Sequence, residues 1–143
     1  MEYRHTQIGT LIIAVFCMIL FLILLVPFIA HSIEPALLLI ILFLVAMLSL
    51  FYSLTVEIHD KTLICSFGIG LIRRRISLTD VAAAQAVRNP WWVGWGIRWY
   101  PGRYWLWNVS GFDAVELLFK NGTVFRIGTN EPESLAQAIR NSI

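Results

Sequence analysis

An uninterrupted apolar run near the N-terminus limits what this chain can fold into more than any other feature. From Ile8 to Ala30 the sequence contains no charged residue. A helix over this run would reach roughly 34 Å at about 1.5 Å per residue, enough to cross a hydrocarbon core of about 30 Å. The whole chain is 58% hydrophobic and only 14% charged, whereas soluble domains carry about 25% charged residues. Part of the chain is therefore expected to lie outside water.

A second apolar run extends from Ala36 to about Leu54 and is shorter but still sufficient to span a membrane. We predict helices over about residues 8–30 and 36–53, joined by a short loop at 31–35, so that residues 1–53 form an antiparallel transmembrane hairpin. A cleaved signal peptide is disfavoured, because its apolar part is usually about 7–15 residues long and no second span follows it at once.

The positions of the cations predict how this hairpin is oriented. Of the 11 Lys and Arg residues, Arg4 precedes the apolar runs, none lies in the loop at 31–35, and the rest follow Leu54. Cationic flanks stay on the cytoplasmic side of membranes. We therefore predict a multi-pass protein of the cell (plasma or inner) membrane with both termini in the cytoplasm.

Residues 54–143 carry short alternating segments bounded by turn residues, which is typical of an antiparallel β-domain. Asn121-Gly122 between two such segments favours a tight hairpin. The segment at 81–87 has helical propensity too, and we predict it as a strand because its neighbours need a partner. The seven predicted strands are Leu54–Ile58, Thr62–Phe67, Leu71–Ser77, Val81–Val87, Tyr104–Asn108, Ala114–Phe119 and Thr123–Ile127.

The end of the chain predicts one amphipathic helix. Thr129 to Glu133 supply a capping residue, an early proline and early acids, and Leu135, Ala138 and Ile139 recur at helical spacing. The predicted fold is thus an α+β membrane protein. A two-helix transmembrane hairpin (1–53) precedes a cytoplasmic domain (54–143), a seven-stranded antiparallel β-sandwich or barrel capped by a C-terminal helix.

Three segments of the second part carry a resemblance to a known family. They are Gly94–Arg98, Asn108–Leu117 and Arg126–Glu133, and they resemble small bacterial membrane proteins with a pleckstrin-homology-like (PH-like) domain preceded by a helical hairpin. The resemblance covers essentially the whole chain and implies a PH-like domain. It implies little about activity, because the family is largely uncharacterised and a fold does not determine a function.

No constellation of reactive groups is recognisable in the sequence. His5, His31 and His59 fall in separate regions of the predicted topology, and Cys17 and Cys65 have neither metal-ligand nor disulfide-framework spacing. We therefore expect no enzyme, no metal site and no cofactor. The net charge of +2 also argues against a nucleic-acid partner.

Tryptophan is concentrated in one stretch. All six Trp residues lie between Trp91 and Trp107, and the loop 89–102 shows no clear strand or helix period. Trp and Tyr favour the membrane–water interface, while Arg is attracted to lipid phosphates. Lipid contact, contact with a protein and internal packing all remain open for this stretch. The predicted membrane or partner interface consists of Trp91, Trp92, Trp95, Arg98, Trp99 and Arg103.

A second cationic feature is the run Arg73-Arg74-Arg75. In a strand, Arg73 and Arg75 share one face and could contact a single lipid phosphate. The alternative is a solvated strand that discourages edge pairing and supports the topology.

Together these features predict a membrane-anchored, non-catalytic PH-like interaction module. It would contact lipid headgroups, including anionic ones, or self-associate through the Trp-rich loop, with a homo-oligomer or another membrane protein as partner. The alternative function is an accessory structural subunit of a larger membrane complex, such as a transporter or envelope-stress system, without lipid recognition.

Overall fold

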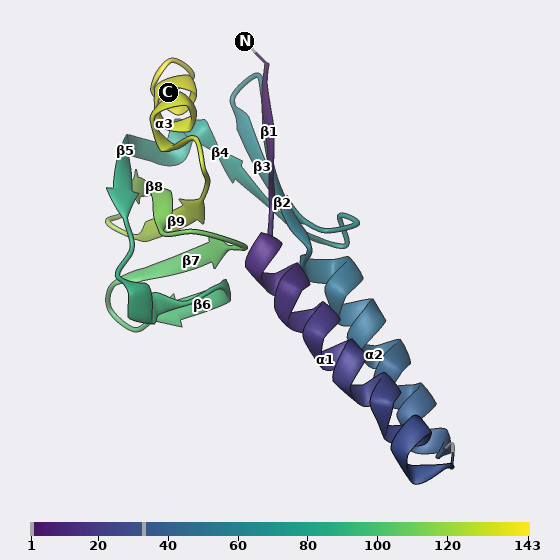
Figure 1. Cartoon of the computed structure of the whole chain (residues 1–143). Helices are drawn as coiled ribbons and strands as arrows, with labels where there is room; N and C mark the ends of the chain where they lie inside the picture. The colour runs from purple at the N-terminus through teal and green to yellow at the C-terminus, as the bar shows by residue number, and fades with distance from the viewer. Residues whose placement is uncertain (1, 33) are drawn as a thin grey trace.

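The computed structural model describes residues 2–32 and 34–143 and consists of two long helices and two β-sheets closed by a short helix (Figure 1). The elements in chain order are β1 (Tyr3–Ile8), α1 (Thr10–Ala30), α2 (Pro35–Phe51), β2 (Ser53–His59), β3 (Thr62–Phe67), β4 (Ile72–Ser77), β5 (Val81–Arg88), β6 (Gly96–Tyr100), β7 (Tyr104–Asn108), β8 (Asp113–Phe119), β9 (Val124–Gly128) and α3 (Pro132–Arg140). Short 3₁₀ turns at Leu78–Asp80 and Trp91–Val93 precede β5 and β6.

Helices α1 and α2 lie side by side and extend away from the sheets (Figure 1). They match the predicted spans to within two residues at each end. By length and composition α1 is sufficient to cross a membrane, whereas α2, with 17 residues, is a shorter apolar helix. Neither helix has a residue that is buried inside the protein, so both present apolar side chains to their surroundings.

The segment before α1 is a strand that the sequence analysis did not predict. β1 pairs antiparallel with β2, from Tyr3 opposite Ile58 to Ile8 opposite Ser53, and forms the edge of a sheet with the order β1-β2-β3-β4. His5 and Gln7 lie on its inward face and Ile8 on its exposed face, so the strand shows no alternation of apolar and polar residues in the sequence. The backbone N–H of Gly9 donates to the carbonyl of Tyr52 at 2.7 Å, so the strand pair passes directly into the helix pair.

All seven predicted strands are present, with bounds within one residue of those expected. The ambiguous segment at 81–87 is a strand, β5, paired with β8. Strand β6 was not predicted, because glycines and bulky aromatic residues obscure its period in the stretch 89–102. With β1 and β6 the described residues form nine strands, so the predicted count of seven is wrong.

The second sheet has the order β5-β8-β9-β7-β6. β8 and β9 form the hairpin around Asn121-Gly122, and β6 and β7 form another, turning at Pro101–Arg103. β5 occupies the free edge of β8, so the second hairpin adds to the other side of β9. There β7 runs parallel to β9. The prediction of a wholly antiparallel sandwich is therefore wrong at this pair.

The core lies between the two sheets and is closed by α3. Inward-facing residues of both sheets meet there, and α3 contributes Leu135, Ala136 and Ile139. A chain of aromatic rings links the core to the helix pair: Phe51 at the end of α2 lies 5.4 Å from Phe67, and Phe67 lies 5.0 Å from Trp107. Aromatic pairs at such spacing add about 0.5–1.5 kcal/mol beyond simple burial, so the helices and the sheets share one packed junction.

The turn between β3 and β4 also docks on this junction. Gly68 has a left-handed φ of 47°, and a Cβ built on it would collide with the carbonyl oxygen of Ser49 in α2. The N–H of Ile69 donates to the same carbonyl at 3.2 Å. Only glycine therefore allows the turn to approach the helix this closely.

We expect Gly68→Ala to destabilise the protein more than Gly70→Ala. Both positions have positive φ, which costs a non-glycine residue roughly 1–2 kcal/mol, but a Cβ at Gly70 meets no atom within 4 Å. Unfolding midpoints of the full chain in mild detergent measure the difference. Equal losses in the two variants would show that the turn does not rest on α2.

Candidate functional site

The Trp-rich stretch forms one edge of the second sheet. It comprises the 3₁₀ turn Trp91–Val93 and the hairpin of β6 and β7. β6 is the outermost strand of its sheet and lies on the side from which the helices extend (Figure 1). We call the surface formed by Trp91, Trp92, Arg98, Trp99, Arg103 and Trp105 the aromatic edge.

The six Trp residues have three different environments. Trp91, Trp92, Trp99 and Trp105 are exposed, with Trp91 79% and Trp99 59% accessible. Trp107 is buried in the core against Phe67. Trp95 is half-buried. The predicted interface residues Trp91, Trp92 and Trp99 therefore lie on the surface, while Trp105, which was not predicted, joins them.

The exposed rings are held in place by neighbouring aromatic residues. Trp99 and Trp105 face each other across β6 and β7 and stack with centroids 6.0 Å apart. Trp92 meets Tyr100 edge to face at 6.2 Å, and the Tyr100 hydroxyl donates to the carbonyl of Val93 at 2.8 Å. These rings are thus ordered before any partner binds, which lowers the entropic cost of binding.

Trp95 stabilises the fold and is not a surface residue of the aromatic edge. Its indole Nε1 donates to the carbonyl of Gly111 at 3.1 Å, and its ring lies 6.1 Å from Phe112. The Nε of Arg98 donates to the Trp95 carbonyl at 3.0 Å, which fixes the Arg98 side chain against the start of β6. The predicted site residue Trp95 thus supports the aromatic edge and fastens it to the following loop.

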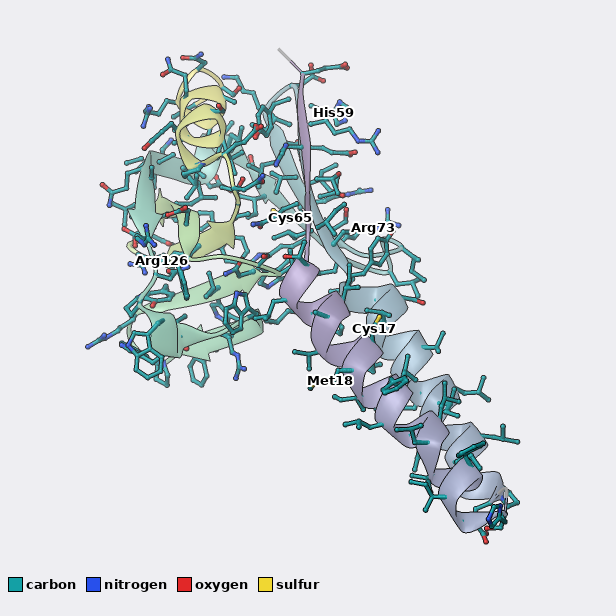
Figure 2. The ribbon with its side chains drawn as sticks, in the orientation of Figure 1. Cys17, Met18, His59, Cys65, Arg73 and Arg126 are labelled. Carbon is teal, nitrogen blue, oxygen red and sulfur yellow. The ribbon has the colours of Figure 1, made fainter. Side chains whose placement is uncertain are left out.

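Arg73 and Arg75 lie exposed on the outer face of β4, and Arg74 points inward over the ring of Phe125 at 4.5 Å. The expected alternation of the three arginines is therefore observed. The Nε of Arg73 donates to the carbonyl of Gly70 at 3.0 Å, and Figure 2 shows Arg73 close to where the helices leave the sheets. The structure places Arg73 and Arg75 on the first sheet and the aromatic edge on the second.

The turn between β3 and β4 carries two apolar residues that the sequence analysis did not single out. Ile69 is 61% and Leu71 72% exposed, although the turn rests against the last turn of α2. The sequence did contain a signal for this exposed apolar site, namely two aliphatic residues in a glycine-containing turn next to an arginine.

The described residues contain no group of three or more His, Cys, Asp or Glu side chains arranged to hold a metal ion. His5 contacts Asn130 at 2.6 Å, whereas His59 lies 3.7 Å from Glu57. Cys65 is fully buried, and this burial raises the pKa of its thiol to about 12, against a smaller lowering by Arg74. The Cys65 thiol therefore stays protonated and inert at neutral pH.

Comparison with protein-family models and with curated proteins finds no match for this chain.

The different positions of Trp95 and Trp91 lead to a stability prediction. Trp95→Phe removes the hydrogen bond to Gly111, worth about 0.5–1.5 kcal/mol, and should lower the unfolding midpoint. Trp91→Phe, at an exposed position, should leave it nearly unchanged. Thermal unfolding followed by circular dichroism tests this, and an unaffected Trp95 variant would contradict the structural position assigned to the residue.

Proposed function

We propose that this protein is a membrane-anchored, non-catalytic interaction module, whose aromatic edge rests in the lipid headgroups at the cytoplasmic surface. One observation carries the proposal: β6 begins beside the helix pair, where its Ile97 lines a groove with Ile12 and Phe16 of α1, and the β3–β4 turn is hydrogen-bonded to α2. The hairpin that carries the aromatic edge and the β3–β4 turn therefore both start from the base of the helices. A bilayer that surrounds the helices would therefore also meet both surfaces.

The helices themselves supply the first support. Their large apolar side chains are widely exposed, up to 78% at Phe28, and water would not tolerate such a continuous apolar surface. We infer that α1 and α2 form a transmembrane hairpin. At about 1.5 Å per residue, α2 covers roughly 26 Å, so a slight local thinning of the bilayer would accommodate it.

The chemistry of the aromatic edge supplies the second support. Indole rings favour the headgroup region, because they are apolar with one polar N–H. Arg98 and Arg103 on the same hairpin are exposed, and each cation near an anionic leaflet contributes about 1 kcal/mol. Ile69 and Leu71 would enter the same layer from the first sheet, with Arg73 beside them.

The fold is consistent with the resemblance to PH-like membrane proteins in having two packed sheets and a closing C-terminal helix. It departs from the expected antiparallel order at the parallel pair of β7 and β9. We keep membership of that family as part of the proposal.

Intrinsic fluorescence provides a direct test, because every Trp lies in the stretch 91–107 and none in the helices. In vesicles made with brominated phospholipid, we expect bromines near the headgroups to quench the emission more than bromines deep in the acyl chains. The double variant Trp91→Phe and Trp92→Phe should lose a large share of this quenching. The variant Trp107→Phe, which removes a buried ring, should lose little.

The opposite result has a definite meaning. If aqueous acrylamide quenches the emission and brominated lipid does not, the aromatic edge faces away from the bilayer, and the lipid proposal is overturned. A protein partner, either a second copy or a larger complex, would then be the function to pursue.

The transmembrane topology is tested with two variants, each of which carries one new thiol. Ser32→Cys places a cysteine in the loop between α1 and α2, and we expect a membrane-impermeant maleimide to label it from outside intact cells. Cys65 is buried and Cys17 lies within α1, so neither native thiol should react. Ser142→Cys near the C-terminus should be labelled only after the membrane is opened. Labelling of Ser142→Cys in intact cells would contradict a cytoplasmic C-terminus.

A further inference from the structure

A groove of about 490 Å³ lies where the helix pair meets the edge of the second sheet. Such a volume is within the range of small-molecule sites, about 300–1,000 Å³. In Figure 1 β6 begins close to the base of α1 and α2. The lining of the groove includes Ile12 and Phe16 of α1, Met47 and Phe51 of α2, and Ile97 and Arg98 of β6.

The walls of the groove are apolar and preformed. Phe51 packs against Phe67 of the core at 5.4 Å, and Ile12 packs against the same core. Phe16 lies one helical turn further along α1, so the groove continues onto the apolar surface that we assign to the bilayer. An apolar chain in the bilayer could therefore enter the groove without crossing water.

Arg98 supplies one cation at the rim of this groove. Its Nε is held by the carbonyl of Trp95 at 3.0 Å. Among the described residues, no carboxylate lies within salt-bridge distance of its guanidinium. The terminal amino groups of Arg98 are therefore available for a phosphate, which guanidinium binds with charge-assisted hydrogen bonds.

We propose that the groove binds one anionic phospholipid, with an acyl chain between α1, α2 and Ile97 and the phosphate on Arg98. We infer a phospholipid because the groove is apolar and open toward the bilayer, which suits an acyl chain, and has one unpaired cation, Arg98, at its rim, which suits a phosphate. This inference rests on the proposed membrane function and extends it from general contact with headgroups to a stoichiometric lipid site.

The charge requirement is tested by native mass spectrometry. The full chain is released from nanodiscs that contain equal amounts of phosphatidylglycerol and phosphatidylcholine. We expect one phosphatidylglycerol to be retained in preference to phosphatidylcholine, and Arg98→Gln to reduce that preference by about tenfold. Lys120→Gln, which removes an exposed cation from the turn between β8 and β9, should leave it unchanged. Equal effects of the two variants would overturn a specific site at Arg98.

The groove itself is tested by filling it. Ile97→Trp should reduce retention of both lipids, while Leu118→Trp, at a comparably exposed strand position, should not; unfolding midpoints show that both variants fold. Millimolar glycerol phosphate should not displace the bound lipid. Displacement, or unchanged retention in Ile97→Trp, would mean that the groove holds no acyl chain and would overturn the inference.

The failure of this inference can be told apart from failure of the proposed function. If no lipid is retained stoichiometrically but brominated headgroups still quench the tryptophans, the groove inference alone is wrong. If neither retention nor quenching occurs, both are wrong.

Discussion

The rest of the structure depends on one constraint: β1 pairs with β2 and α1 packs against α2 without a break between the two pairs. β1 and β2 hold each other in register up to Ile8 and Ser53, and α1 and α2 continue from that point with no linker. The Gly9–Tyr52 hydrogen bond closes the junction on one side, and the Gly68 N–H, bonded to the Ser53 carbonyl at 2.8 Å, closes it on the other. The domain therefore cannot swing freely about the helices.

This fixed junction decides which surfaces lie at the base of the helices. The second sheet is attached to the junction through Phe67 and Trp107, so its outer strand β6 is held beside α1 and α2. The β3–β4 turn is held beside α2 by its own backbone hydrogen bond. In the proposed function neither surface would need a separate binding step, because insertion of the helices would place both at the bilayer surface.

The tertiary structure also sorts the arginines by what surrounds them. Arg126 forms a 2.7 Å ion pair with Glu116 and lies 3.9 Å from the ring of Tyr104, so its charge is compensated internally; Figure 2 shows it on the second sheet, away from the helices. Arg74 is directed inward over Phe125. Arg73 and Arg98 instead bind backbone carbonyls through Nε alone. The terminal amino groups of Arg73 and Arg98 thus form no hydrogen bond or ion pair among the described residues, and of these two arginines Arg98 is the one that lines the groove.

Local pattern by itself determined the two apolar helices, seven of the strands and the closing helix, because each has a period or a turn signal contained in its own residues. It also pointed to Trp91, Trp92 and Trp99 as surface residues. Strands β1 and β6 were not predicted, for two different reasons. β1 is stabilised by β2, which is distant in the sequence across the two helices, whereas β6 lies in a hairpin whose glycines and aromatic residues obscure its period. Only the tertiary structure distinguished Trp107, buried in the core, and Trp95, held by its hydrogen bond, from the exposed tryptophans. Only the tertiary structure showed that Arg98 lies beside the helices. Whether a side chain is buried, and which residues lie near it, depends on how separate segments pack together, so the sequence of one segment does not reveal it.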